Sequence, residues 1–219
     1  MNIQDTNKRI RLIMALRNKG ITDTAVLAAM EKIPRDVFVP AAVLDQAWDD
    51  IALPIGRGQT ISQPLVVASM TQALRLSDRD KVLEVGTGCG YQCAILARLC
   101  RRVYTVERHK ILLEGAEKRL EELRVRNVTA IAGDGMKGWP KQAPFDKIIV
   151  TAAARGKPPQ ALLEQLKDGG LMVIPVENDG AQVLKLYKKE SDEAYSVKDL
   201  MPVRFVPLLP EIAKEHDAA

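Results

Sequence analysis

Three acidic residues stand beside a glycine-rich segment and could together bind a positively charged ligand. The segment GTGCG occupies residues 86–90, directly after the β-rich run KVLEV at 81–85. Glu84 lies two residues before the first glycine, whereas Glu107 and Asp134 end the β-rich runs 101–107 and 128–134. Ligands of open parallel sheets bind at the carboxyl ends of the strands, so we expect the three carboxylates to converge on the rim of one site.

The charge of such a rim excludes one class of ligand and favours another. Three carboxylates would repel a pyrophosphate. They would accept hydrogen bonds from a ribose diol and an adenine amino group and would attract an ammonium; S-adenosylmethionine carries these groups together with a sulfonium. Each acid taken singly also has a structural interpretation, because Glu84 could cap a loop, Glu107 could pair with Arg108, and Asp134 could cap the helix that follows.

The spacing of the glycines separates this segment from the dinucleotide fingerprint. That fingerprint needs a Gly or Ala three places after its second glycine, and here that place is Tyr91. The spacing is GxGxG instead. Together with the acidic cluster, it argues against a nicotinamide oxidoreductase.

Short β-rich runs alternate with helical segments after residue 80. The predicted strands are 81–85, 101–107, 128–134, 145–151 and 169–176, and the predicted helices are 91–100, 109–125 and 158–167. The alternation predicts an α/β fold with a doubly wound, mostly parallel, Rossmann-like sheet that is covered on both faces. Two further β-rich segments, 181–190 and 195–208, follow without a helix between them and are expected to form an antiparallel hairpin at one edge.

The first third of the chain reads as helices followed by a loop. Apolar spacing predicts one helix over 7–19 and a second that begins at Thr22 or Asp23 and ends at Met30. Residues 37–39 lie between prolines and are expected to be extended, and residues 49–64 are expected to form a structured loop. We therefore expect a single domain over 1–219, with N-terminal helices and this loop in 1–64, the ligand-binding α/β core in 65–189, and an edge strand and tail in 190–219.

Composition limits the partners and the compartment. The chain has 219 residues, 32 Lys and Arg against 28 Asp and Glu, and nine aromatic residues. Charges are interspersed and stacking side chains are few, so nucleic acid is not an expected partner. No apolar run approaches the roughly 20 residues that cross a bilayer and no signal peptide is recognisable, so we expect a cytoplasmic, monomeric protein that does not bind membranes.

The cysteines do not suggest a metal site or a disulfide framework. Cys89, Cys93 and Cys100 are crowded into one short segment without CxxC spacing. An odd number of neighbouring cysteines cannot link distant parts of a fold, so we expect reduced thiols. The histidines stand too far away in sequence to indicate zinc, and we expect no metal.

Several of these segments resemble the protein-L-isoaspartate (D-aspartate) O-methyltransferases, a family of class I S-adenosylmethionine-dependent methyltransferases. The similarity includes ALPIGRGQTISQP, VLEVGTGCGYQCAILA, VYTVER, GDG, APFDKIIVTAA, LKDGGLMVIPV and VRFVPL, and it covers roughly residues 30–208 in order. The glycine turn is shared by many methyltransferases, whereas GQTISQP and RFVPL are more specific to this family. Leu65 and Cys89 depart from its usual pattern, and the tail after Leu208 matches nothing.

The resemblance implies methyl transfer from S-adenosylmethionine to the free carboxylate of L-isoaspartyl or D-aspartyl residues in damaged proteins and peptides, which starts repair through a succinimide and leaves S-adenosylhomocysteine. It also implies roles for individual residues. Ser62 corresponds to the family's active-site serine and, with Ile61, to part of its substrate pocket. The implied cofactor contacts are Gln59, Thr60, Ile61, Glu84, Val85, Gly86, Thr87, Gly88, Gly90, Glu107, Asp134 and Gly135, and the implied substrate edge is Val203, Arg204, Phe205, Val206, Pro207 and Leu208.

Ser62 also has a purely structural interpretation. It precedes Gln63 and Pro64 at the start of an apolar helical pattern, so its hydroxyl could cap a helix. Spacing alone favours the cap, whereas the resemblance favours catalysis. A carboxylate substrate is ionised at neutral pH, so the enzyme needs alignment, supplied by a hydrogen-bond donor such as Ser62, more than it needs a general base.

Two other functions are weaker interpretations of the sequence. Methyltransferases that act on amino nitrogens often carry an Asp/Asn-Pro-Pro-aromatic motif after the fourth strand, and this chain reads VTAAARGKPP there. A non-catalytic S-adenosylmethionine-binding module would have lost the substrate-side segments, yet GQTISQP and RFVPL are intact. A methyltransferase with another carboxylate substrate is the remaining alternative.

Overall fold

The core of the molecule is one eight-stranded, mostly parallel sheet. The computed structural model describes residues 3–191 and 194–214. The order across the sheet is β10-β9-β8-β6-β3-β4-β5, with the short β7 (Ala154–Arg155) pairing with β8. The parallel strands are β3 (Lys81–Val85), β4 (Arg102–Glu107), β5 (Val128–Ala132), β6 (Phe145–Val150) and β8 (Leu166–Asn178). The predicted α/β class is confirmed.

Side chains alternate between the two faces of the sheet because strand residues have a period of two. Val82, Val103 and Ile149 point into a core that also contains the buried faces of α1 (Ile3–Asn18), α2 (Thr24–Lys32), α3 (Pro64–Ala73), α4 (Tyr91–Ala97) and α5 (Lys110–Glu122). Leu83 and Ile148 point the other way, into a core that α6 (Gln160–Glu164) covers. Two 3₁₀ turns, η3 (Gly135–Lys137) and η4 (Pro140–Gln142), connect β5 to β6, and Trp139 and Ala143, on either side of η4, pack against this core. The sheet is therefore covered on both faces, but unequally.

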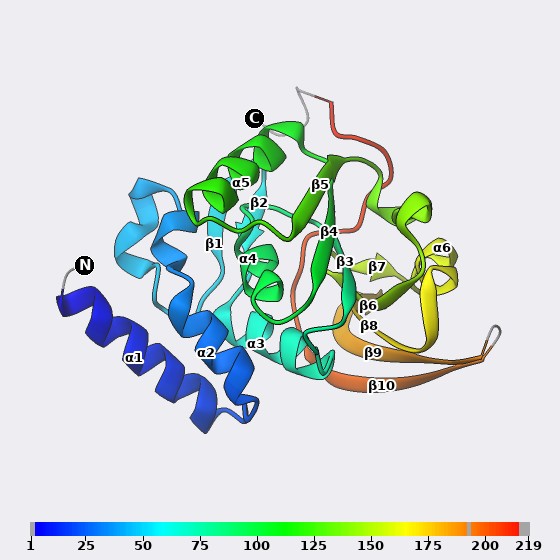
Figure 1. Ribbon diagram of the computed structural model, residues 1–219, viewed down its shortest axis with the longest axis horizontal. Helices are drawn as coiled ribbons and strands as arrows, with labels where there is room; N and C mark the ends of the chain where they lie inside the picture. Colours follow the sequence, from blue (N-terminus) through cyan, green and yellow to red (C-terminus); the bar gives the residue numbers. More distant parts are fainter. Residues whose placement is uncertain (1–2, 192–193, 215–219) are drawn as a thin grey trace.

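The N-terminal helices follow the predicted capping chemistry. The Asp23 carboxylate accepts hydrogen bonds from the amides of Ala25 and Val26, and α2 ends just before Pro34. The helix predicted over 7–19 begins earlier, at Ile3. Figure 1 shows α1 and α2 gathered on the left side of the molecule, whereas the β9–β10 hairpin extends to the right. Among the described helices, none is long and apolar enough to cross a membrane.

Two N-terminal predictions are wrong in their local structure. Residues 37–39 were expected to be extended, but 37 and 38 belong to the 3₁₀ turn η1 (Arg35–Phe38) and only Val39 is extended. A second 3₁₀ turn, η2 (Ala41–Gln46), follows. Within 49–64, expected to be a loop, β1 (Leu53–Gly56) and β2 (Gln59–Ile61) form an antiparallel hairpin. Arg57 and Gly58 both have positive φ, 53° and 64°, as a tight type I′ turn requires. Arg-Gly is a weak signal for that turn compared with Asn-Gly or Asp-Gly.

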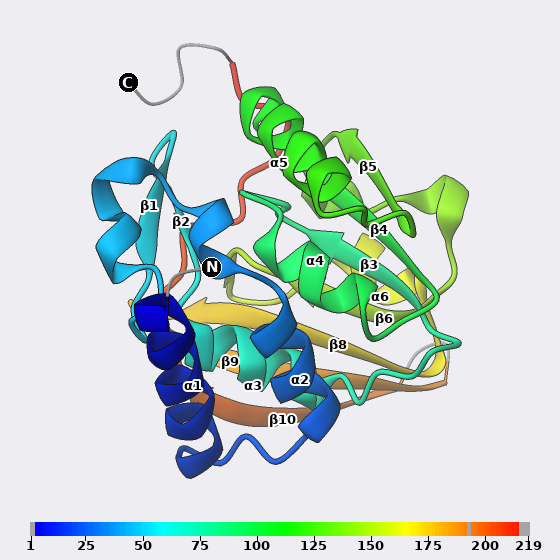
Figure 2. The ribbon, with the colours of Figure 1, turned by 60° about the vertical axis from the view of Figure 1, so that its left-hand side comes forward.

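The C-terminal hairpin is shorter than predicted. β9 (Ala181–Ser191) pairs with β10 (Ala194–Pro202) only as far as Pro202. The Gln182 side chain then holds the Phe205 backbone, accepting from its amide at 2.7 Å and donating to its carbonyl at 3.1 Å. Ala153 bonds to Val206 and Leu208, so the chain turns toward the carboxyl ends of the strands. Figure 2 shows this red segment beside the β1–β2 hairpin.

Candidate active site

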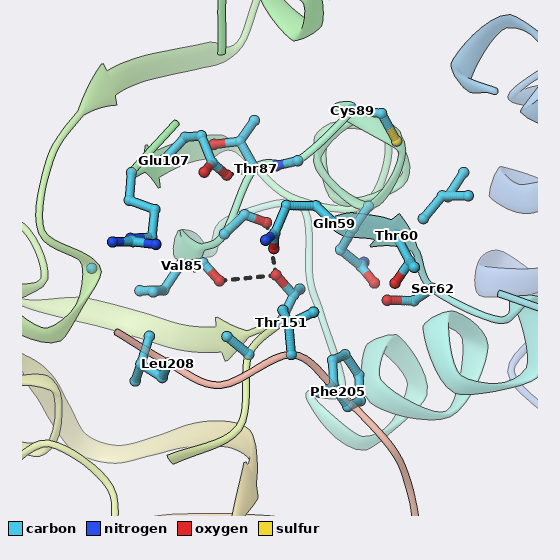
Figure 3. Close-up of a pocket in the computed structure, with 18 of the residues that line it drawn as sticks. Gln59, Thr60, Ser62, Val85, Thr87, Cys89, Glu107, Thr151, Phe205 and Leu208 are labelled. Carbon is cyan, nitrogen blue, oxygen red and sulfur yellow. Dashed lines mark hydrogen bonds between the residues drawn. The ribbon is translucent and has the colours of Figure 1, made fainter. Parts of the chain in front are cut away.

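A pocket opens at the carboxyl ends of β3 and β4, where three distant segments meet. The glycine turn forms its floor, the strand and loop at 59–62 form one wall, and the C-terminal residues 205–209 form another. Figure 3 shows Glu107 and Thr87 at one end of the pocket, Ser62 and Thr60 at the other, and Gln59 and Thr151 between them. The lining residues are Gln59, Thr60, Ile61, Ser62, Val67, Val85, Gly86, Thr87, Gly88, Cys89, Tyr91, Gln92, Val106, Glu107, Arg108, Gly135, Thr151, Ala152, Phe205, Val206, Pro207, Leu208 and Leu209.

Thr151 fixes the start of the glycine turn. Its hydroxyl donates to the carbonyl of Gly86 at 2.7 Å and also lies 3.1 Å from that of Val85. Gly86 has φ +95°, and a Cβ there would overlap the Thr151 Oγ1 atom. A left-handed backbone and a close approach thus both require glycine at this position.

Glu107 is the one predicted acid that lines the pocket. Its Oε2 atom accepts from the amide of Gly88 at 2.8 Å, and its Oε1 atom accepts from the amide of His109 at 2.9 Å. A carboxylate has about four lone-pair positions. Glu107 is 4% exposed, held rigidly by these two amides, and still able to accept two hydrogen bonds from a diol.

The prediction that three carboxylates converge on the rim is wrong for Glu84. Its side chain is fully buried beneath the turn, where its Oε2 atom accepts from the hydroxyl of Thr105 at 2.6 Å. Burial raises the pKa of Glu84 to about 8, since the charged form loses its hydration. A β3 side chain at this register points into the helix-covered core instead of the pocket.

Asp134 and three other predicted contacts also lie outside the pocket lining. The Asp134 carboxylate accepts from the amide of Met136 at 2.9 Å and caps η3, and the next residue, Gly135, lines the pocket. Gly90, which precedes the first residue of α4, packs against Ala116 of α5. Val203 packs against the core and Arg204 is exposed, because the chain reaches the pocket only from Phe205 onward.

Ser62 is not a helix cap. The N-cap residue of α3 is Gln63, and the amide of Leu65 is satisfied by the Asp50 carboxylate at 2.8 Å. Ser62 lines the pocket and is half-buried. Within the described part of the chain its hydroxyl makes no hydrogen bond, which leaves it available to a ligand.

Comparison with known sequences identifies the family. The sequence model of protein-L-isoaspartate (D-aspartate) O-methyltransferases matches residues 7–213. The chain belongs to this family. It is an S-adenosylmethionine-dependent enzyme that methylates isoaspartyl residues, and a non-catalytic binding module is not favoured.

Similar proteins cover nearly the whole chain. A protein-L-isoaspartate O-methyltransferase of Rhodospirillum centenum is 55% identical over 212 residues, which are 97% of this chain and 96% of the relative. One of Parvibaculum lavamentivorans is 56% identical over 210 residues, 95% of this chain and 94% of the relative.

Two solved structures of isoaspartate methyltransferases share this fold. One protein-L-isoaspartate O-methyltransferase aligns with a TM-score of 0.84 and 29% identity over 93% of this chain and 67% of that chain. A putative enzyme of Plasmodium falciparum, in complex with S-adenosyl-L-homocysteine, aligns with a TM-score of 0.79 and 25% identity over 91% of this chain and 97% of that one.

Some pocket residues of this isoaspartate methyltransferase were missed from the sequence. Thr151 and Ala152 follow β6 at the same edge of the sheet as the glycine turn, so the strand-end rule could have indicated them. Tyr91 and Gln92, in the first turn of α4, gave no such signal. Tyr91 is covered by the fully buried Arg35, whose guanidinium carbon lies 5.0 Å from the ring centroid.

The three cysteines are free and buried, as expected. Cys89 lines the pocket, but burial raises the pKa of its thiol to about 11, so it stays protonated at neutral pH and is a poor nucleophile. Within 3–191 and 194–214, no three or more His, Cys, Asp and Glu side chains gather in a way that could hold a metal ion.

Proposed function

We propose that Glu107 holds the ribose diol of S-adenosylmethionine and that Ser62 orients the substrate carboxylate at the opposite end of the pocket. The residues fit such a nucleoside. Glu107 keeps two lone pairs for a diol, the glycine turn lets the backbone approach closely, and Val85, Val106 and Leu208 supply apolar contact for a base. When bound, the nucleoside supplies an electrophilic methyl group on a sulfonium.

The single observation that carries the role of Ser62 is its hydroxyl, which faces the pocket and makes no hydrogen bond within the described residues. A carboxyl of pKa about 3.5 to 4 is already ionised at neutral pH, so no general base is needed. Ser62 would donate one hydrogen bond to the carboxylate and hold its other oxygen in line with the methyl carbon. A neutral donor orients the oxygen without removing the charge that makes it nucleophilic.

The segment 205–208 would contact the substrate peptide with part of its backbone only. Phe205 already uses both its amide and its carbonyl on Gln182, and Ala153 takes the Val206 carbonyl and the Leu208 amide. The predicted continuous edge for the substrate is therefore interrupted. We expect the Phe205 side chain and the remaining backbone groups to position the peptide beside Ser62.

Methylation would start repair. Methyl transfer to a carboxylate oxygen would break the sulfur–methyl bond, leaving S-adenosylhomocysteine and an isoaspartyl methyl ester. The neighbouring backbone nitrogen then displaces methanol, and the resulting succinimide opens with water to aspartate or isoaspartate. Damaged proteins and peptides of this kind are the expected partners. D-Aspartyl residues present a carboxylate of the same chemistry and are the second proposed substrate.

Transfer of a labelled methyl group to an isoaspartyl peptide, its normal aspartyl twin and its D-aspartyl form tests this proposal. We expect label on the isoaspartyl and D-aspartyl peptides and none on the aspartyl twin. Equal labelling of all three peptides would show that the enzyme does not distinguish the isoaspartyl or D-aspartyl carboxylate from that of a normal aspartyl residue, and would exclude this proposal.

A further inference from the structure

A chain of hydroxyl hydrogen bonds joins the buried Glu84 to the pocket wall. Thr105 donates to the Glu84 Oε2 atom at 2.6 Å, and the hydroxyls of Thr87 and Thr105 lie 2.6 Å apart. While Glu84 is ionised, Thr105 donates its one hydroxyl hydrogen to the carboxylate and accepts from Thr87; a protonated Glu84 can instead donate to Thr105, which then donates to Thr87. The direction of the chain is set by the protonation state of the carboxyl group at its inner end.

The same chain continues to the acid that lines the pocket. Thr87 is followed by Gly88, whose amide donates to the Glu107 Oε2 atom at 2.8 Å. Figure 3 shows Thr87 and Glu107 side by side. A displacement of Thr87 would move the Gly88 amide and release one of the two bonds that hold the Glu107 carboxylate.

The groups around Glu84 give its carboxyl no other strong donor. Thr105 faces it from β4, the thiol of Cys93 faces it from α4, and Ile149 is its apolar neighbour on β6. The charge of Glu107 repels the ionised form of Glu84. The Oε1 atom of Glu84 is buried without a hydrogen-bond partner in the described structure.

We propose that Glu84 is a positioning residue of this methyltransferase: through Thr105 and Thr87 it fixes the glycine turn and, with it, the Glu107 carboxylate. This inference rests on the proposed role of Glu107 in holding the nucleoside. The burial of Glu84 excludes direct contact with the cofactor. Its effect would instead be transmitted to the glycine turn through two hydroxyl groups, first that of Thr105 and then that of Thr87.

Thr105→Val tests the connection because Thr105 is fully buried and does not line the pocket. We expect the Kd of S-adenosylhomocysteine, measured by calorimetry, to rise about tenfold, a loss of the order that a broken buried network produces. Thr105→Ser keeps the hydroxyl and should stay close to the wild type. Val103→Thr makes the reverse change on the same strand and face and should destabilise the fold without changing the Kd.

The pH dependence of the Kd of S-adenosylhomocysteine is a second measurement, which nonspecific destabilisation of the fold would not change. An ionised carboxylate is a stronger hydrogen-bond acceptor than a protonated one. We therefore expect the ratio of the Kd of S-adenosylhomocysteine at pH 7 to that at pH 9 to be about threefold larger in the wild type than in Glu84→Gln. The Gln amide accepts a hydrogen bond but does not titrate. Titration of the ligand's own amino group is common to both proteins and cancels in this ratio.

The outcomes separate this inference from the proposed function. Wild-type affinity in Thr105→Val, an equal loss in Val103→Thr, or identical pH profiles of wild type and Glu84→Gln would each overturn the positioning role while leaving the proposed function intact. A wild type that bound no S-adenosylhomocysteine would overturn both. Should Thr105→Val fail to fold, the pH comparison decides alone.

Discussion

At the residue scale, Ser62 offers a neutral hydroxyl to a carboxylate substrate. A hydrogen bond to a charged group contributes roughly 1.5–3 kcal/mol. We therefore expect Ser62→Ala to lower kcat/KM for an isoaspartyl peptide about 10- to 150-fold, at roughly 1.4 kcal/mol for each factor of ten. The Kd of S-adenosylhomocysteine should change less than about twofold, because Ser62 lies at the opposite end of the pocket from Glu107.

Ser196→Ala is the control for this substitution. Ser196 is an exposed residue of β10 that bonds to Glu190, and its replacement should leave methyl transfer at the wild-type rate. Unchanged turnover in Ser62→Ala would exclude the assigned role.

Glu84 makes the stability of the fold depend on pH. Burial raises its pKa from 4.5 to about 8, so the folded state holds the proton more tightly than the unfolded state. This contribution to the free energy of unfolding is fully present below pH 4.5 and declines as the pH rises to about 8, by at most ~1.4 kcal/mol per pH unit. Glu84→Gln should lack this decline.

Urea unfolding of the wild type and of Glu84→Gln between pH 5 and 9 measures their free energies of unfolding. As the pH rises, Glu84→Gln should become increasingly more stable relative to the wild type. Glu114, on the exposed face of α5, provides the matched control, since Glu114→Gln should keep the wild-type slope. A constant difference between wild type and Glu84→Gln across this range would contradict the buried, protonated state.

At the scale of an element, the glycine turn between β3 and α4 is held by a threonine from a neighbouring strand. Gly86→Ala would place a methyl group against the Thr151 hydroxyl in a left-handed backbone. Left-handed conformation alone costs roughly 1–2 kcal/mol, and the overlap adds to it. We expect a clear loss of Tm and of S-adenosylhomocysteine binding.

A substitution at Gly180, in the turn between β8 and β9, distinguishes the backbone strain from the overlap with Thr151. It also has positive φ, 79°, but a Cβ there would meet nothing within 4 Å. Gly180→Ala should therefore cost only the backbone strain and leave binding unchanged. Similar losses of binding in both variants would show that the contact with Thr151 has no special effect.

At the scale of the whole molecule, the pocket joins segments far apart in the sequence, so a ligand should stabilise the entire fold. S-Adenosylhomocysteine at about 100 times its Kd should raise the free energy of unfolding by roughly 2.7 kcal/mol. For a chain of this size that corresponds to a Tm increase of roughly 5–10 °C. Thermal unfolding measured by circular dichroism, with adenosine monophosphate as a comparison ligand, would detect it. An equal shift with both ligands would contradict specific recognition of S-adenosylhomocysteine.

Three further expectations about the whole molecule stay predictions: a monomeric state, a cytoplasmic location, and the absence of nucleic-acid and membrane partners. Light scattering would measure the mass in solution against the 24.2 kDa of one chain.

Local patterns in the sequence determined the order and type of most elements and the glycine turn, because strand periodicity, capping side chains and glycine spacing act over a few residues. The strand-end rule placed Glu107 at this edge of the sheet, where it lines the pocket; its contact with the cofactor stays a proposal. The short hairpin at 53–61 and the 3₁₀ turns near Phe38 were missed, since their signals are short and depend on what packs against them.

Only the tertiary structure decided what each acid does. Glu84, Glu107 and Asp134 look alike in sequence, yet one is buried beneath the turn, one lines the pocket and one caps η3. The direction in which a strand-end side chain points depends on its register and on the helices that cover each face. The path of 203–208 was likewise set by Gln182 and Ala153, whose contacts join residues that are distant in the chain.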